Sequence, residues 1–382
     1  MKSILFINYE YPPIGGGAAT ATYYFASEFA SKGFKTTVLT SAFKEYHGVS
    51  EESKVTVFRI PALRKYIEKS SFVQMIFFII SAAIYLFRIV KKSDPDVLIT
   101  FFSIPCGPVG LIAHVIWGFP YAVMLRGGDV PGSDSQLRLL HKLLQPLRRL
   151  VYQKSLAIIA NSQGLKHLAQ KADPEFTIHV IPNGVDTAFF SPEQLSSSTR
   201  NAPFIFLFAG RVCQQKNLGV LIKAFSMCLQ YHPNTELVIA GDGPLLPQIK
   251  LFASTLNLDK KIRWTGWQSR EKIKSLYLEV DCVVNPSLNE GMPNVVLEAM
   301  SCGRAVIASD CAGNSDLIVD KHNGFLFPAD DHFELTKLMM LMINDRELNF
   351  KIGVRGREIC CSQYSWAAAA KKLQSVIINN KS

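Results

Sequence analysis

The chain has 382 residues, of which 48% are hydrophobic, a formal net charge of +10 and eight cysteines. This length suits two domains better than one compact core, and the hydrophobic fraction excludes a disordered chain. The cysteines form neither a Cys-x-x-Cys pair nor a Cys/His cluster, which disfavours a disulfide framework or a zinc site and predicts reduced thiols in the cytoplasm. The apolar run at residues 4–7 is too short for a signal peptide, so none is expected.

Short apolar strands alternate with helices along the whole sequence. This alternation predicts two doubly wound α/β domains with parallel sheets, covering residues 1–190 and 200–350 and joined by a linker within 187–203. The predicted strands lie near residues 3–8, 35–40, 54–60, 96–100, 120–125, 156–161, 177–182, 204–209, 235–240, 261–264, 281–285, 304–308 and 324–327.

A glycine run, residues 15–17, follows the first predicted strand and opens a helix. Glycines in this position let backbone N–H groups approach a phosphate or sugar closely, so Gly16 and Gly17 are candidate donor contacts. A dinucleotide-binding fingerprint is disfavoured, since Thr20 stands where its third glycine belongs and the second strand ends in Thr40-Ser41, without an acid for a ribose. A tight turn without a ligand is the alternative.

Residues 72–90 form a mostly apolar run that is long enough, as a helix, to span roughly 28 Å. Its polar members Gln74, Ser81, Tyr85 and Arg88 fall on one helical face, and the strands before and after it should share one sheet. We therefore expect a buried or partly interfacial helix, with a membrane span as the alternative.

Two short charged motifs follow. Asp94-Pro-Asp96 leads into a predicted strand instead of following one, so we interpret it as the start of a strand and not as a metal site. Arg126 and Asp129 lie after the strand at 120–125, where ligands bind in such sheets. Asp129 is a candidate acceptor contact and Arg126 a candidate phosphate contact, and an ion pair between the two is the alternative.

Residues 137–154 carry leucines on one helical face and Arg138, Lys142 and Arg149 on another. This amphipathic pattern is compatible with binding to a membrane surface, and core packing explains the leucines equally well. Pro146 should bend or break the helix.

The strand at 204–209 ends in Gly210-Arg211 and is followed by Lys216-Asn217, just before a helix. Arg211 and Lys216 are in a position to neutralise a diphosphate, although ordinary solvated side chains are the alternative. Further on, Gly241-Asp-Gly-Pro244 is expected to form a tight turn between a strand and a helix.

Glu290 lies in the loop after the strand at 281–285, and Glu298 lies eight residues later in a helix that Gly303 should end. The free N–H groups of such a helix start attract anions, and a carboxylate further in accepts hydrogen bonds from sugar hydroxyls. The apolar neighbours of Glu298 disfavour a solvated side chain there. The helix start supplies the candidate donor contacts Gly291, Met292, Asn294 and Val295.

These motifs together resemble the retaining glycosyltransferases of family four, which carry a glutamate pair of this spacing and a G-R-x-x-x-x-K-N element. The resemblance covers nearly the whole chain. It implies the GT-B fold, in which two Rossmann-like domains face each other across a cleft and a C-terminal helix, here 362–382, packs back on the first domain. Residues 11–17, 182–186, 241–244 and 313–318 fall where the family has similar elements.

The resemblance also implies roles for single residues. Arg211 and Lys216 would hold the donor diphosphate, Glu298 the nucleotide ribose, and Glu290 would contact the donor sugar. Many relatives have a histidine where this chain has Arg126, and that histidine contacts the reacting sugar, so its role has no obvious carrier here.

The expected function is therefore a metal-independent hexosyltransferase without a cofactor, whose catalytic set is Arg211, Lys216, Glu290 and Asp129. Its partners would be a nucleoside-diphosphate sugar and a glycan or lipid-linked acceptor of polysaccharide or lipopolysaccharide synthesis, with no nucleic acid. A catalytically silent nucleotide-sugar-binding subunit is the first alternative, and an epimerase or phosphorylase of the same fold is the second.

The charge is unevenly distributed, with +7 on residues 1–190, +4 on 352–382 and −1 between them. A basic first domain predicts a cytoplasmic protein bound peripherally to the anionic inner face of the cell membrane. Solvated surface charge is the alternative.

Overall fold

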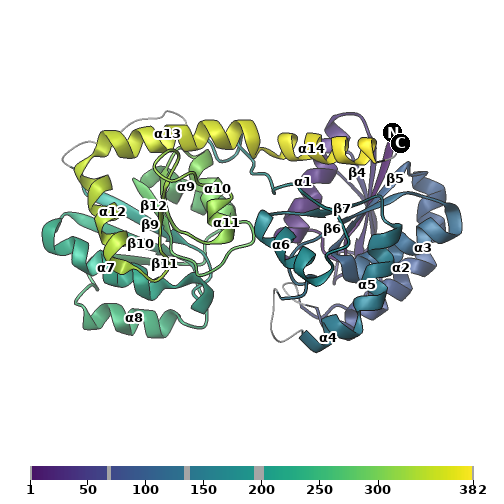
Figure 1. Ribbon diagram of the computed structural model, residues 1–382, viewed down its shortest axis with the longest axis horizontal. Coiled ribbons are helices and arrows are strands. Elements are labelled where there is room, and N and C mark those ends of the chain that lie inside the picture. The colour runs from purple at the N-terminus through teal and green to yellow at the C-terminus, as the bar shows by residue number, and fades with distance from the viewer. Residues whose placement is uncertain (1, 67–69, 133–137, 193–201, 381–382) are drawn as a thin grey trace. The chain divides into compact units, whose positions relative to one another are not determined.

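The computed structural model describes residues 2–66, 70–132, 138–192 and 202–380. The chain divides into two compact units. The first comprises the residues up to Asn183 together with those from Trp366 onward, and the second runs from Gly184 to Ser365. Figure 1 shows each unit as a β-sheet with helices on both faces. The predicted α/β class with two parallel sheets is confirmed.

The first unit is built on an eight-stranded sheet of order β3-β4-β2-β1-β5-β6-β7-β8. Its strands are β1 (Ser3–Ile7), β2 (Lys35–Ser41), β3 (Gly48–Glu52), β4 (Val55–Ile60), β5 (Val97–Phe101), β6 (Tyr121–Met124), β7 (Ala157–Ala160) and β8 (Ile178–Val180). Its helices are α1 (Gly17–Ser31), α2 (Phe72–Ser93), α3 (Gly107–Trp117), α4 (Arg138–Leu143), α5 (Gln145–Lys154), α6 (Gln163–Ala172) and α14 (Trp366–Asn379), with a π-helical turn η1 (Phe102–Cys106).

Strand β3 was not predicted. It is a mostly exposed, polar strand that pairs antiparallel with β4 at the edge of the sheet, so it lacks the apolar run that marks the buried parallel strands. Its partner contributes the buried Arg59, whose guanidinium pairs with Glu52 at 2.7 Å.

One face of the first sheet is covered by α2, α3, α5 and α6, and the other by α1 and α14. The C-terminal helix α14 packs on this unit from its first residue onward. The indole of Trp366 stacks on Tyr24 with ring centroids 4.9 Å apart and meets Phe25 edge-on. Ala370 and Leu373 continue the buried side of α14. A stacked aromatic pair and small residues let α14 and α1 pack closely.

Helix α2 begins with a capping box, in which Ser71 and Gln74 bond each other's backbone N–H groups, and it packs on β1, β2 and β4. It is long and apolar enough to cross a membrane by length and composition, and a third of its apolar window is buried in the protein. Of the four polar residues predicted to share one face, Gln74 and Ser81 are buried, whereas Tyr85 and Arg88 are exposed. The polar stripe runs along the border between two apolar faces.

The outward face of α2 is apolar and follows helical spacing. Ile84 is 71% exposed, and the residues that share its face are Val73, Ile76, Ile80 and Phe87. Helices α4 and α5 are separated at Leu144, two residues before Pro146, as predicted from that proline. Leu137, where that helix was expected to begin, lies outside the described residues.

The second unit has a six-stranded, fully parallel sheet of order β11-β10-β9-β12-β13-β14. Its strands are β9 (Phe204–Ala209), β10 (Thr235–Ala240), β11 (Ile262–Gly266), β12 (Cys282–Asn285), β13 (Ala305–Ser309) and β14 (Phe325–Phe327). Its helices are α7 (Leu218–Tyr231), α8 (Leu246–Thr255), α9 (Arg270–Glu279), α10 (Asn294–Ser301), α11 (Ala312–Ser315), α12 (His332–Asn344) and α13 (Arg346–Gln363), with a 3-10 turn η3 (Gln214–Lys216).

Helices α7 and α12 cover one face of this sheet, and α9, α10 and the end of α13 cover the other. Helix α13 approaches the end of α10 so closely that a Cβ on Gly353 would lie 2.2 Å from the carbonyl oxygen of Gly303. A side chain at this position would therefore push the two segments apart.

The close contact at Gly353 predicts that replacing this helical glycine by alanine destabilises the protein, which is the opposite of the usual effect. Gly→Ala inside a helix normally stabilises by about 1 kcal/mol, whereas overpacking costs about 1–3 kcal/mol. We expect Gly353→Ala to lower the midpoint of thermal unfolding. The control is Gly219→Ala in α7, where the new Cβ would have no atom within 4 Å, so it should be neutral or slightly stabilising. An unchanged or raised midpoint for Gly353→Ala would contradict the close packing.

Candidate active site

Two loops meet at the carboxyl edge of the second sheet because β9 and β12 are neighbouring strands. The loop after β9 carries Arg211 and Lys216, and the loop after β12 carries Glu290. In parallel α/β sheets ligands bind outside this edge of the strands. The sheet order thus brings together residues that the sequence places 74 positions apart.

An ion pair and two hydrogen bonds join these loops. Nζ of Lys216 lies 2.5 Å from Oε1 of Glu290, and both side chains are largely buried. The backbone N–H of Leu288 donates to the carbonyl of Gln215 at 2.8 Å, and the amide of Gln215 donates to the carbonyl of Asn289 at 2.9 Å. The cation and the first carboxylate of the predicted site are therefore held against each other.

Arg211 lies at the start of the same loop, and its side chain is exposed. None of the ion pairs among the described residues involves it, so its guanidinium is available to an anion. A guanidinium binds phosphate oxygens through paired hydrogen bonds.

The backbone around Arg211 is fixed by the next loop along the sheet. Gly210 donates to the carbonyl of Ala240 at 2.9 Å and Val212 to that of Asp242 at 2.8 Å. A Cβ on Gly241 would lie 1.8 Å from the carbonyl oxygen of Gly210, so only glycine allows this approach. The predicted tight turn at 241–244 therefore supports the Arg211 loop.

A buried polar network lies beneath Glu290. The amide of Asn285 donates to Asn314 at 2.9 Å, the Ser287 hydroxyl donates to Asn285 at 2.8 Å, and the Ser309 hydroxyl donates to the carbonyl of Ser287. Because a buried polar group without a partner is costly, this closed set fixes the path of the chain from β12 to Glu290. The sequence analysis assigned none of these residues a role in such a network.

Glycine 313 presses on the Glu290 loop from the side. A Cβ at this position would lie 2.7 Å from the carbonyl oxygen of Glu290 and 2.8 Å from its Cβ. The 313–318 segment, noted in the sequence as a family element, thus positions the first carboxylate.

Helix α10 starts directly after the Glu290 loop. Pro293 is its N-cap and Asn294 its first residue, so the candidate donor contacts Gly291, Met292, Asn294 and Val295 all lie at the start of the helix. Gly291 and Asn294 are exposed there. Unpaired N–H groups and the positive end of the helix dipole favour a negatively charged group at this point.

Glu298 lies inside α10 and receives a hydrogen bond of 3.0 Å from the hydroxyl of Tyr277 on α9. Burial raises the pKa of Glu298 to about 7, although this hydrogen bond and the charge of Arg270 both lower it. The sequence predicted that Glu298 would not be a solvated carboxylate, but it did not identify Tyr277 as the partner. At neutral pH this carboxyl is close to its titration midpoint.

In the first unit, Gly16 is the N-cap of α1 and Gly17 its first residue, and both have open space where a side chain would be. Gly15 has a φ of +95°, and a Cβ there would collide with the buried Glu10. Glu10 itself lies 3.7 Å from Arg64. The run therefore combines a tight turn at Gly15 with an open helix start at Gly16 and Gly17.

Asp129 is buried and accepts three backbone hydrogen bonds, from Ser103 at 2.6 Å, Arg126 at 2.9 Å and Gly127 at 3.2 Å. Burial raises the pKa of this carboxyl, and the hydrogen bonds lower it. The structure thus gives Asp129 a clear role in holding the loop after β6.

The Arg126 guanidinium contacts groups other than the Asp129 carboxylate. It donates to the side-chain oxygen of Asn183 at 2.6 Å and lies 4.5 Å from the centre of the Phe101 ring. Burial lowers its pKa to about 9. No side-chain ion pair with Asp129 is present among the described residues, so that alternative is wrong.

Asp96 accepts backbone hydrogen bonds from Lys2 at 2.5 Å and Ser3 at 3.0 Å, so the Asp94-Pro-Asp96 motif ties the starts of two strands together, in line with the interpretation from sequence. Within the described part of the chain, no group of three or more His, Cys, Asp and Glu side chains is arranged to hold a metal ion.

Comparison with known proteins gives two family matches that together cover most of the chain. Residues 15–189 match the model described as Glycosyltransferase Family 4, and residues 192–359 match the one described as Glycosyl transferases group 1. A UDP-Gal:alpha-D-GlcNAc-diphosphoundecaprenol alpha-1,3-galactosyltransferase of Escherichia coli is 30% identical over 70% of this chain and 71% of its own length. An alpha-maltose-1-phosphate synthase of Mycolicibacterium smegmatis is 26% identical over 70% and 74%.

Solved structures share the fold over nearly the whole length. Sucrose-phosphate synthase from Thermosynechococcus elongatus has a TM-score of 0.81 at 21% identity and covers 99% of both chains. HepE of Anabaena, solved in complex with UDP and glucose, has a TM-score of 0.75 at 20% identity and covers 99% of this chain and 100% of its own. The architecture is GT-B. With the Arg211, Lys216, Glu290 and Glu298 motif at the carboxyl edge of its second sheet, this chain belongs to glycosyltransferase family 4.

Proposed function

We propose that this glycosyltransferase moves a sugar from a nucleoside-diphosphate sugar to a hydroxyl of a glycan or lipid-linked acceptor, with retention of the anomeric configuration and without a metal ion. The observation that carries the proposal is the joining of the Lys216 and Glu290 loops beside the exposed Arg211 and the start of α10. Cations, free N–H groups and two carboxylates at one sheet edge match the parts of a nucleotide sugar.

Each part of the donor would contact its own group of residues. Its diphosphate would be met by Arg211, Lys216 and the N–H groups at the start of α10, which together stabilise the charge that develops as the sugar leaves. Glu298 would accept hydrogen bonds from the ribose hydroxyls, and Glu290 would contact the donor sugar. The solved relative HepE, which holds UDP, supports this donor class.

A lipid-linked acceptor is supported by the relative from Escherichia coli, whose name gives GlcNAc-diphosphoundecaprenol as its acceptor. It is also supported by the outward apolar face of α2, because such a surface gains free energy at a membrane boundary. We therefore propose a cytoplasmic enzyme that binds peripherally to an anionic membrane through its first unit.

A catalytically silent nucleotide-sugar-binding subunit is the second candidate. It is favoured by Arg126, which replaces the histidine of many relatives and whose guanidinium is engaged with Asn183 and Phe101. Release of free nucleoside diphosphate that depends on an acceptor separates the transferase from this subunit, which would bind donor and release nothing.

The pKa of Glu298 predicts a pH-dependent affinity for the donor. If ribose hydroxyls bind its ionised form, a pKa of about 7 makes donor binding roughly tenfold tighter at pH 8 than at pH 6. Calorimetry with UDP across this range measures it. Glu298→Gln should bind UDP weakly and without the pH step. The hydrogen bond from Tyr277 lowers the pKa of Glu298 in the wild type, so Tyr277→Phe should raise that pKa and move the step to higher pH. A wild-type affinity that does not change with pH would contradict the ribose role.

The ion pair between Lys216 and Glu290 predicts how substitutions combine. Lys216→Ala removes a charged contact to the diphosphate and leaves a buried carboxylate unpaired beside it, so UDP affinity should fall by about 10- to 100-fold, equivalent to roughly 1.5–3 kcal/mol. In the double variant with Glu290→Gln, part of the loss should be recovered, because the repelling charge is gone. Strictly additive losses would show that the two side chains do not act on the diphosphate together.

Transfer should also persist in excess EDTA, because side chains and backbone N–H groups meet the diphosphate charge. The control is Lys216→Ala, whose lost rate should not return when magnesium or manganese is added. Complete loss of wild-type transfer in EDTA, with recovery on addition of either ion, would overturn the metal-independent proposal.

The membrane proposal predicts salt-sensitive binding to vesicles. Ile80→Asn with Ile84→Asn, on the exposed face of α2, should reduce sedimentation with anionic vesicles at low salt, and high salt should reduce it for the wild type. Leu251→Asn, an exposed apolar residue of the second unit, is the matched control. Equal binding to neutral and anionic vesicles would reject the electrostatic part, and resistance to both salt and carbonate would favour a membrane span.

A further inference from the structure

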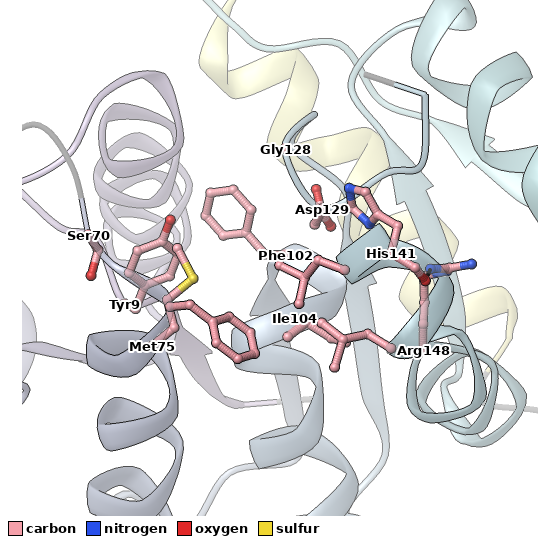
Figure 2. Close-up of a pocket in the computed structure, with 12 residues that line it drawn as sticks. Tyr9, Ser70, Met75, Phe102, Ile104, Gly128, Asp129, His141 and Arg148 are labelled. Atoms are coloured by element: carbon pink, nitrogen blue, oxygen red, sulfur yellow. Dashed lines mark hydrogen bonds between the residues drawn. The ribbon is translucent and has the colours of Figure 1, made fainter. Parts of the chain in front are cut away.

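A cavity of about 270 Å³ lies within the first unit, and it is slightly smaller than typical small-molecule sites of about 300–1,000 Å³. It is formed by Tyr9 after β1, the start of α2, turn η1, the loop after β6, and helices α4 and α5 (Figure 2). The residues that form most of its wall are Tyr9, Phe72, Met75, Phe102, Ile104, Leu140 and Leu144. None of the predicted donor contacts lines it.

The charged groups in the wall are already bound to the protein. Asp129 accepts its three backbone hydrogen bonds, and Arg148 pairs with the buried Asp173 at 2.8 Å and donates to the carbonyl of His141 at 3.2 Å. The hydroxyl of Ser70 donates to Gln74 at 3.2 Å. A sugar needs hydrogen-bond partners for its hydroxyls, and Asp129, Arg148 and Ser70 have little capacity left to supply them, so Tyr9 and His141 are the remaining polar side chains in a mainly apolar wall. The cavity therefore fits a hydrocarbon group better than a sugar.

The wall of the cavity continues into exposed apolar surface. Phe72 lines the cavity and is 41% exposed, and Val73 follows it on the open face of α2. The wall residues Leu140, on α4, and Leu144, directly after it, are adjacent in sequence to Leu139 and Leu143, which are 83% and 77% exposed. Apolar surface of this extent is expected where a protein meets a membrane or another apolar partner.

The surface at the same helix is basic. Arg138 and Lys142 are one turn apart on α4 and both are exposed. They stand next to the leucines in sequence, so a molecule with a hydrocarbon chain and an anionic head meets complementary groups on both parts. This combination distinguishes a lipid phosphate from a neutral apolar ligand.

We propose that this cavity binds the hydrocarbon chain of the lipid phosphate that carries the acceptor, in the segment next to the phosphate, while Arg138 and Lys142 attract the head. The inference rests on the proposed function for the identity of the lipid. It assigns the selection of a lipid-linked acceptor to a chain-binding site made by α2, η1, α4 and α5.

Calorimetry with short lipid phosphates below their aggregation concentration tests the cavity. Farnesyl phosphate represents a prenyl chain and dodecyl phosphate an acyl-type chain, and inorganic phosphate lacks the chain. The wild type should bind at least one of the two lipid phosphates at least tenfold more tightly than inorganic phosphate, and the tighter of the two identifies the kind of chain. Equal affinity for all three would overturn the proposal.

The matched variants are Leu140→Trp, which fills the cavity, and Leu139→Trp, which adds the same bulk to the exposed face of the same helix. Filling should weaken the binding of the preferred lipid phosphate at least tenfold, whereas Leu139→Trp should bind like the wild type. Met75→Trp fills the cavity from α2. It replaces Leu140→Trp in the binding test if the thermal midpoint of Leu140→Trp shows that this variant does not fold. Filled variants that fold and bind like the wild type would overturn the proposal.

These measurements need neither donor nor transfer, so they stand apart from the proposed function. A protein that binds the lipid phosphate through this cavity and transfers no sugar would refute the transferase and leave the chain site in place. A protein that transfers sugar to a lipid-linked acceptor equally well with the cavity filled would refute the chain site and leave the transferase in place.

Discussion

The adjacency of β9 and β12 is the constraint on which the candidate site depends. In the order β11-β10-β9-β12-β13-β14 these two strands lie side by side, so the loops that leave them meet at one edge. Lys216 and Glu290 form their ion pair only because of this order. The remaining contacts serve to keep the two loops in place: Gly241 allows the neighbouring loop to support Arg211, and Gly313 allows α11 to press against Glu290. The site is thus a property of sheet topology first and of individual side chains second.

The ion pair also prepares the site electrostatically. Without a ligand, a largely buried ammonium group would be costly, and Glu290 neutralises it. In the proposed function a diphosphate would bring negative charge to the same place, and Lys216 would then share its hydrogen bonds between the phosphate and Glu290. Under this proposal the closed polar network that fixes the loop below Glu290 would serve binding, since a carboxylate that had to reorganise at each binding event would lose part of the stabilisation that a preorganised site gives.

The sequence predicted the fold well because its main signals are local. Apolar strands, Pro146 and the glycines at strand ends each act within a few residues, and the structure has all the expected strands and one that was not expected, β3, which is polar and mostly exposed. The site was predicted less completely because its supports are distant in sequence. Tyr277 reaches Glu298 from another helix, and Ser103 supplies an N–H group to Asp129 from another loop. Periodicity likewise located α2 but did not determine which of its faces is buried, since apolar residues cover both sides of it.

That two-sided helix connects the fold to the proposed acceptor. Its inner face packs on β1, β2 and β4, and Gln74 donates to the carbonyl of Leu63 at 2.8 Å, so extraction into a bilayer would uncover a sheet face and break a partly buried hydrogen bond. Its outer face is apolar and exposed, so contact of this face with a membrane would uncover no part of the sheet. A helix with this arrangement gains free energy by lying at the boundary of a membrane while it stays part of the domain. Since Phe72 and Met75 at its start also line the cavity, the surface proposed to meet the membrane and the site proposed to take a lipid chain share one element.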